Sequence, residues 1–160
     1  MQINDITGAI IEISIEIHRR LGPGLLESVY RKVLAHELRK KGFEVEEEWP
    51  IPVEWDNVRL EVGFRADLLV NGVVLVELKS VEKIATVYKK ILLTYLRISD
   101  RRIGLLINFG EEVLKNGIHR IANNYIEEAP CDISLNTSKL RTNTSAHSAP
   151  LRETALKNCN

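Results

Sequence analysis

Charged residues interrupt a largely apolar stretch, Phe64 to Lys79, whose composition is typical of a β-hairpin. Valine and leucine dominate this stretch, and Asn71-Gly72 is a strong signal for a tight turn between two strands. The charged residues that matter are Asp67, Glu77 and Lys79. A charge buried in a sheet costs on the order of several kcal/mol unless it is paired or binds a metal. The stretch therefore predicts a functional site.

Two close carboxylates repel each other, and a bound cation is the natural reason for a fold to bring them together. Carboxylate oxygens suit magnesium or manganese. Lys79 lies two positions after Glu77, so both side chains leave the same face of a strand. There a lysine can hold a water molecule or stabilise charge on a phosphoryl group. The alternative is a cluster of surface ion pairs at a strand end, since charged residues are common.

The length of the hairpin loop decides whether the two carboxylates serve one site. A two-residue loop at Asn71-Gly72 pairs Val70 with Val73 and places the carboxylates on opposite faces. A three-residue loop, or a bulge, pairs Val70 with Val74 and places them on the same face. We predict the second arrangement, in which the four charged residues between positions 65 and 79 share one face.

Two amphipathic helices are predicted before the hairpin. Isoleucines recur at helical spacing from Ile3 to Ile17, and a second helix is expected from about Leu25 to Lys41. Glu27 lies in the first turn of this second helix, where the helix dipole favours a carboxylate without any catalytic role. We expect the basic residues of the second helix to face solvent: Arg31, Lys32, Arg39, Lys40 and Lys41.

The remaining pattern predicts strands and one more helix. An extended region from Phe43 to Val62 turns at Asp56-Asn57, and apolar residues from Ile84 to Tyr95 recur at helical spacing. The continuous apolar run Ile103 to Phe109 indicates a strand buried on both faces, and a short strand follows at Ile118 to Ala122. The order of helix, helix, strands, helix, strand, strand predicts an α/β or α+β domain.

Composition narrows the classes of function. The chain has 160 residues, of which 44% are hydrophobic, and its 22 basic and 22 acidic residues give a net charge of zero. These values indicate a globular protein and argue against a strongly basic, non-specific nucleic-acid binder. Neither a signal-peptide pattern nor an apolar run of about 20 residues occurs, so we expect a cytoplasmic protein without membrane association. Cys131 and Cys159 lack the spacing of a zinc site.

A change of composition near position 125 predicts a domain boundary. Residues 1–125 carry the apolar periodicity, whereas serine, threonine and asparagine dominate residues 126–160. We expect one domain followed by a polar, disordered tail, with a short helix around Leu151 to Lys157.

Several motifs resemble a known group of enzymes. Asp67 followed by Glu77-Leu78-Lys79 resembles the PD-(D/E)xK nuclease superfamily. The segment Gly24-Leu-Leu-Glu27-Ser-Val-Tyr30 resembles the signature of the GxxExxY protein family, a branch placed in that superfamily. The resemblance covers roughly residues 3 to 125. It extends over further blocks of sequence: Ile17 to Tyr30, Ala66 to Val70, Val76 to Ser80, Leu92 to Leu96 and Gly104 to Phe109.

The resemblance implies a restriction-endonuclease-like core, in which helices flank a mixed central β-sheet, and an activity that hydrolyses phosphodiester bonds with Mg²⁺ or Mn²⁺. By family role, Asp67 and Glu77 are metal ligands, and the backbone carbonyl of Leu78 is a third. Lys79 is the catalytic lysine, and Glu27 reaches the metal directly or through water.

The family motifs also include residues around this centre. His18 and Tyr30 belong to them, either beside the site or in buried structural roles. Before Leu92 the family usually carries a His-x-x-Gln pattern whose glutamine faces the site, but here these positions read Tyr88-Lys-Lys-Ile91. Tyr88 is expected beside the site, and isoleucine at position 91 cannot hydrogen-bond a water molecule or a phosphate.

The implied substrate is nucleic acid, with DNA favoured over RNA. Arg65, Lys83, Lys89 and Lys90 are candidates for contact with its phosphates, and the alternative for the helix lysines is a solvated basic face. The loss of the glutamine and the zero net charge support a second interpretation: a weak or inactive nuclease fold that binds nucleic acid or a protein partner. Nothing in the sequence indicates a homo-oligomer.

Overall fold

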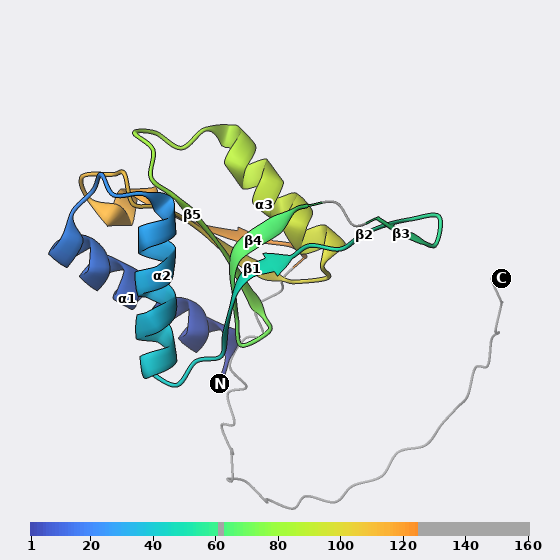
Figure 1. The fold of residues 1–160 in the computed structure, drawn as a ribbon, viewed down its shortest axis with the longest axis horizontal. Coiled ribbons are helices and arrows are strands. Elements are labelled where there is room, and N and C mark those ends of the chain that lie inside the picture. Colours follow the sequence, from blue (N-terminus) through green and yellow to red (C-terminus); the bar gives the residue numbers. More distant parts are fainter. Residues whose placement is uncertain (61–62, 125–160) are drawn as a thin grey trace, which may run out of the picture. The chain divides into compact units, whose positions relative to one another are not determined.

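The computed structural model describes residues 1–60 and 63–124, which form a five-stranded mixed sheet with helices on both faces (Figure 1). The predicted α/β order of elements is confirmed. The predicted tail, residues 126–160, and its short helix lie outside the described residues. No helix in the described part of the chain is long and apolar enough to cross a membrane.

The elements follow one another in the predicted order. The first helix ends before the glycine-proline segment at positions 22–24, and the second begins with Glu27. The helices and strands have these bounds: α1 Ile3–Leu21, α2 Glu27–Lys40, β1 Val45–Pro50, β2 Val53–Trp55, β3 Val58–Leu60, β4 Arg65–Val70, β5 Val74–Lys79, α3 Thr86–Ile98, β6 Ile103–Asn108, the short 3₁₀ helix η1 Leu114–Gly117, and β7 Ile118–Ala122.

The main sheet has the strand order β1-β4-β5-β6-β7, and only β5 and β6 run parallel. Helix α3 makes the crossover between these two strands, as parallel neighbours require. Strands β2 and β3 form a separate two-stranded sheet, joined at the predicted turn Asp56-Asn57. Both turn residues have positive φ, of 49° and 64°, which suits a tight hairpin turn.

The two faces of the main sheet have separate apolar cores. Helices α1 and α2 cover one face, where the isoleucines of α1 pack with Leu68, Val76 and Leu105. Helix α3 covers the other face and packs on Leu69 and Leu75. Strand β6 is buried along its whole length between these layers, as its continuous apolar run predicts.

The register of the β4–β5 hairpin confirms the predicted loop. Val70 pairs with Val74, so the connection has three residues and includes Asn71 and Gly72, both with positive φ. Side chains alternate along each strand, and Leu69 and Leu75 face α3. The odd-numbered charged residues of the two strands therefore leave the sheet on the α3 face.

The chain after β5 is fixed by the end of β6. The buried side chain of Asn108 accepts the Val81 N–H at 3.0 Å and donates to the Val81 carbonyl at 2.8 Å. It also accepts the Gly110 N–H at 3.1 Å. A Cβ at Gly110 would lie 2.7 Å from the Val81 carbonyl carbon. Glycine is therefore required where the two segments meet, and this contact anchors the residues that follow Lys79.

We predict that Gly110→Ala lowers the free energy of unfolding by about 1–3 kcal/mol, because the new methyl group overlaps rigid backbone. The matched control is Gly8→Ala, at an exposed position of α1 where a Cβ would meet nothing within 4 Å. That change should raise stability by about 0.5–1 kcal/mol through helix propensity. Urea denaturation followed by circular dichroism measures both. Equal effects of the two substitutions would contradict the tight contact.

Candidate active site

Lys79, the last residue of β5, lies at the centre of the charged cluster. Its ammonium group donates to Glu77 Oε1 at 2.8 Å, to Glu27 Oε1 at 3.2 Å and to the Leu78 carbonyl at 2.7 Å. The side chains of Lys79 and Glu77 are each only 13% exposed. These three oxygens include most of the predicted metal ligands, so the structure brings them together around a single cation.

Glu27 reaches the sheet because the loop before α2 is tied in place. The buried hydroxyl of Tyr30 donates to the Gly22 carbonyl at 2.6 Å and accepts the Leu25 N–H at 3.2 Å. Ser80, directly after the lysine, donates to the Leu25 carbonyl at 2.7 Å. Tyr30 therefore positions the turn that starts α2, which fits the structural role considered for it.

Asp67 approaches the same centre from β4. Its Oδ2 accepts the Leu78 N–H at 2.8 Å, and its Oδ1 lies 3.4 Å from the Arg31 guanidinium. The described strand pairing between β4 and β5 ends at Leu68 and Val76. The carboxylate thus satisfies a backbone donor of β5 beyond the paired region, and this hydrogen bond fixes one of its oxygens.

Arg31 corrects the expectation that the basic residues of α2 all face solvent. Its side chain is only 17% exposed and contacts both Asp67 and Glu48, the latter at 3.3 Å. Its Nε atom is buried and finds no hydrogen-bond partner among the described residues. Arg31 follows Glu27 by four positions, so both lie on one face of the helix. The spacing of four residues from Glu27 is the feature of the sequence that could have identified Arg31 as a residue of the site.

Burial and charge shift the pKa values of the central pair. Burial raises the pKa of Glu77, and the carboxylates of Asp67 and Glu27 add to this, against the opposing effect of Lys79. Burial alone would lower the pKa of Lys79, but its hydrogen bond to Glu77 and the nearby carboxylates raise it overall. Lys79 is therefore held in its charged form.

Two tyrosines of α3 border the cluster. The Lys79 ammonium lies 5.5 Å from the ring centroid of Tyr88, which places that residue beside the site as expected. Tyr95 was missed by the sequence analysis. Burial raises its pKa, and so does the nearby Glu77 carboxylate. Its spacing of seven residues from Tyr88 places both on one helix face, with Ile91 between them.

Residues 4–121 match the family model of the PD-(D/E)XK nuclease superfamily. The chain belongs to the PD-(D/E)XK nuclease superfamily. Neither the curated proteins nor the solved structures yield a significant match. The mixed sheet with helices on both faces agrees with the restriction-endonuclease-like core expected of this superfamily.

Nucleases of this superfamily generally use divalent metal ions, and the oxygens at the end of β5 have the chemistry for one. Glu77 Oε2 is buried and has no hydrogen-bond partner among the described residues, so it has free acceptor capacity. In the described ranges, however, no three Asp, Glu, His or Cys side chains converge closely enough to hold an ion. The Lys79 ammonium lies among these oxygens instead, so a metal would require this side chain to move.

The other residues considered for the site form no hydrogen bond or ion pair with the cluster among the described contacts. His18 is buried, and its Nε2 is 2.8 Å from the Glu111 carbonyl, which indicates a structural role. Lys89 lies near His119 on β7. Burial lowers the pKa of the His119 imidazole, and the positive charge of Lys89 lowers it further. In the described contacts, the remaining basic candidates form no ion pair with the cluster, and all three are exposed: Arg65, Lys83 and Lys90.

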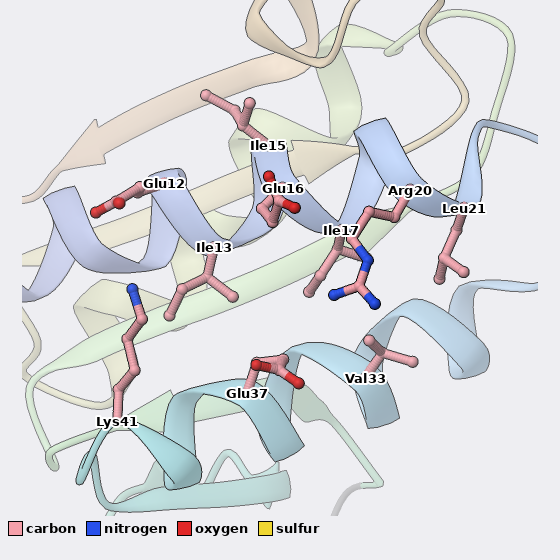
Figure 2. Close-up of a pocket in the computed structure, with 10 residues that line it drawn as sticks. All are labelled: Glu12, Ile13, Ile15, Glu16, Ile17, Arg20, Leu21, Val33, Glu37 and Lys41. Carbon is pink, nitrogen blue, oxygen red and sulfur yellow. The ribbon is translucent and has the colours of Figure 1, made fainter.

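A separate groove of about 510 Å³ lies between α1 and α2 (Figure 2). Apolar side chains such as Ile13, Ile17 and Val33 line it, together with Glu37 of α2 and Lys41, which directly follows α2. None of the charged residues around Lys79 contributes to this lining. The groove is therefore distinct from the candidate active site.

We predict that Arg31→Met lowers the free energy of unfolding by about 1–3 kcal/mol, because two carboxylates lose a charged hydrogen-bonding partner. The matched control is Lys32→Met, on the same helix as Arg31, since Lys32 is 68% exposed and pairs with Glu47 of β1. Because the lysine is exposed and Glu47 keeps Arg39 as a second partner at 2.9 Å, this change should cost less than about 1 kcal/mol. Urea denaturation of both variants measures the difference. If Lys32→Met costs as much as Arg31→Met, the guanidinium does not have the structural role assigned to it.

Proposed function

We propose that residues 1–125 form a metal-dependent nuclease that hydrolyses phosphodiester bonds in nucleic acid, with DNA favoured over RNA. The observation that carries this proposal is the convergence of Glu27, Glu77 and the Leu78 carbonyl on one cation, the Lys79 ammonium. We further assign the chain to the GxxExxY branch of the superfamily, on the segment from Gly24 to Tyr30.

In this proposal Asp67, Glu77 and the Leu78 carbonyl hold Mg²⁺ or Mn²⁺, and Glu27 contacts it directly or through water. Oxygen donors of this kind are what these hard cations prefer. The ion, when bound, supplies Lewis-acid stabilisation of a phosphoryl group and lowers the pKa of a water molecule.

Lys79 supplies a positive charge. In the arrangement of the structure, its hydrogen bond to Glu77 and the nearby carboxylates raise its pKa, against the effect of burial, and so favour the ammonium form. A protonated lysine beside the scissile phosphate stabilises the negative charge that develops on the phosphoryl oxygens and holds a water molecule by hydrogen bonding. The ring of Tyr88 lies 5.5 Å from this ammonium and interacts favourably with its charge.

We predict that the wild-type protein cleaves labelled DNA in the presence of Mg²⁺ or Mn²⁺, and that Lys79→Met lowers the cleavage rate by about 100-fold or more. The reason is the loss of a preorganised positive charge at the phosphate. Single- and double-stranded DNA and RNA of one sequence are incubated with each metal and with EDTA, and products are resolved on denaturing gels.

The control variant is Lys40→Met, at a lysine that is 70% exposed near the end of α2. It should cleave at the wild-type rate. Isothermal titration calorimetry with Mn²⁺ shows whether the Lys79→Met variant still binds the metal. The variant should bind Mn²⁺ at least as tightly as wild type, because the competing ammonium is gone. Cleavage by Lys79→Met at the wild-type rate would overturn the assigned role.

A second candidate function is a nuclease-fold module that binds nucleic acid or a protein without turnover. Ile91 supports it, since this residue lies on the same face of α3 as Tyr88 and Tyr95 and offers no hydrogen bond. The Lys79 ion pairs support it too, because they already neutralise part of the acidic cluster. Such a module would bind nucleic acid in a salt-dependent way, and EDTA would leave that binding unchanged.

The substitution Ile91→Gln separates the two candidates. We predict that it raises the metal-dependent cleavage rate by about 10-fold or more, because one positioned hydrogen-bonding group near the phosphate has an effect of this order. Leu93→Gln is the control, because Leu93 lies two residues further along α3 and therefore on a different face of the helix. If wild type binds DNA without cleaving it and Ile91→Gln is equally inactive, the binding module is the better description.

A further inference from the structure

An aromatic pair lies at the outer edge of the charged cluster. Phe64 directly precedes β4 and is 49% exposed, although its backbone is fixed by the Ile51 N–H, which donates to the Phe64 carbonyl at 2.8 Å. The rings of Phe64 and Tyr95 have centroids 6.1 Å apart and are tilted by 51°. An aromatic ring is thus left half-covered beside α3.

This pair is continuous with the candidate active site. Tyr95 shares a face of α3 with Tyr88, whose ring lies 5.5 Å from the Lys79 ammonium. Phe64 is separated from Asp67 by two residues of β4. The aromatic rings therefore extend outward from the cluster, along the side of the site that α3 covers, while α2 supplies Glu27 from the other side.

Positive charges flank these rings. Arg65 follows Phe64 directly and is exposed, and Lys79 lies at the inner end of the aromatic series. A single strand of nucleic acid presents phosphates and base faces in alternation, and proteins bind it by combining cations with aromatic stacking. This part of the chain supplies both components, since an exposed arginine follows Phe64 and the Lys79 ammonium lies near Tyr88. An apolar segment of a protein partner would leave Arg65 unmatched.

We propose that Phe64 and Tyr95 form a stacking platform for one unstacked nucleobase, next to the phosphate that Lys79 contacts. This inference rests on the proposed nuclease function and names its substrate class, single-stranded or frayed DNA. Inside a duplex both faces of a base are covered by its neighbours, so the base must leave the stack, at a cost in free energy, before it can reach the platform. The platform therefore selects single strands over duplexes.

Fluorescence of 2-aminopurine tests the platform, because this base analogue is quenched when it stacks. The full-length protein is titrated in EDTA, where no metal-dependent cleavage occurs, with a single-stranded DNA that carries the analogue and with a hairpin duplex of the same sequence. We predict that wild type quenches and binds the single strand preferentially. Phe64→Ala should weaken single-strand binding by about 5- to 100-fold, the range for the loss of one stacked base, and should change duplex binding by less than about twofold.

Two further variants keep the test specific. Phe64→Trp retains a stacking surface and should bind the single strand within about threefold of wild type. Val113→Ala removes another exposed apolar side chain, 59% exposed, and should bind as wild type does. Equal losses on single strand and duplex would overturn the platform, as would unchanged binding by Phe64→Ala or a wild-type protein that binds neither DNA.

The outcome is distinguishable from failure of the nuclease proposal. Absence of Mg²⁺-dependent cleavage by wild type would overturn the nuclease and leave the stacking readout intact. Cleavage by wild type together with wild-type binding by Phe64→Ala would overturn the platform alone.

Discussion

The ammonium of Lys79 is the interaction on which the end of the sheet depends. Glu77 is carried by β5, a strand in which every residue except Glu77 and Lys79 is fully buried, and Glu27 is brought close to it by a separate helix. Without a cation between them, these carboxylates would repel at low exposure to solvent. The lysine allows the fold to bring them together. The pKa of Lys79 is raised because the carboxylates stabilise its charge, and the pKa of Glu77 is raised because burial disfavours its charged form.

Three hydrogen-bonding side chains outside the cluster hold this end of the sheet in place. The parallel pairing of β5 with β6 places Lys79 beside Asn108, whose amide fixes the chain immediately after the lysine. The α1–α2 turn is tied to the same segment by Ser80 and by the buried hydroxyl of Tyr30. Because these anchors are hydrogen bonds to backbone, they fix the path of the chain rather than any one side-chain contact.

Much of this could be predicted from sequence because it follows from local rules. Alternation of valines around Asn71-Gly72, together with the requirement that two carboxylates share a face, led to the three-residue loop and to the pairing of Val70 with Val74. The bounds of β7 and the burial of β6 likewise follow from short-range patterns of apolar residues. In each case the period of the strand determines which side chains point together.

The roles of Arg31 and Tyr95 could not be predicted, because they depend on how a helix crosses the sheet. A basic residue on α2 looks solvated until the crossing brings it over Asp67 and Glu48. Tyr95 looks like an ordinary core aromatic until the end of β5 is placed beside it. The net charge of zero does not predict the charge around Lys79 either, because affinity for phosphate depends on the local electrostatic field and not on the total charge of the chain.

Within the cluster itself, carboxylates outnumber cations. Among the described residues, Glu27, Glu77, Asp67 and Glu48 form ion pairs with just two cations, Lys79 and Arg31. Burial raises the pKa of Glu77, the nearby carboxylates raise it further, and its Oε2 has no hydrogen-bond partner in the described part of the chain. A divalent cation would supply the missing charge at the oxygens with unused acceptor capacity. It would also free Lys79 to interact with a phosphate, and in this way the excess of acidic groups supports the proposed chemistry.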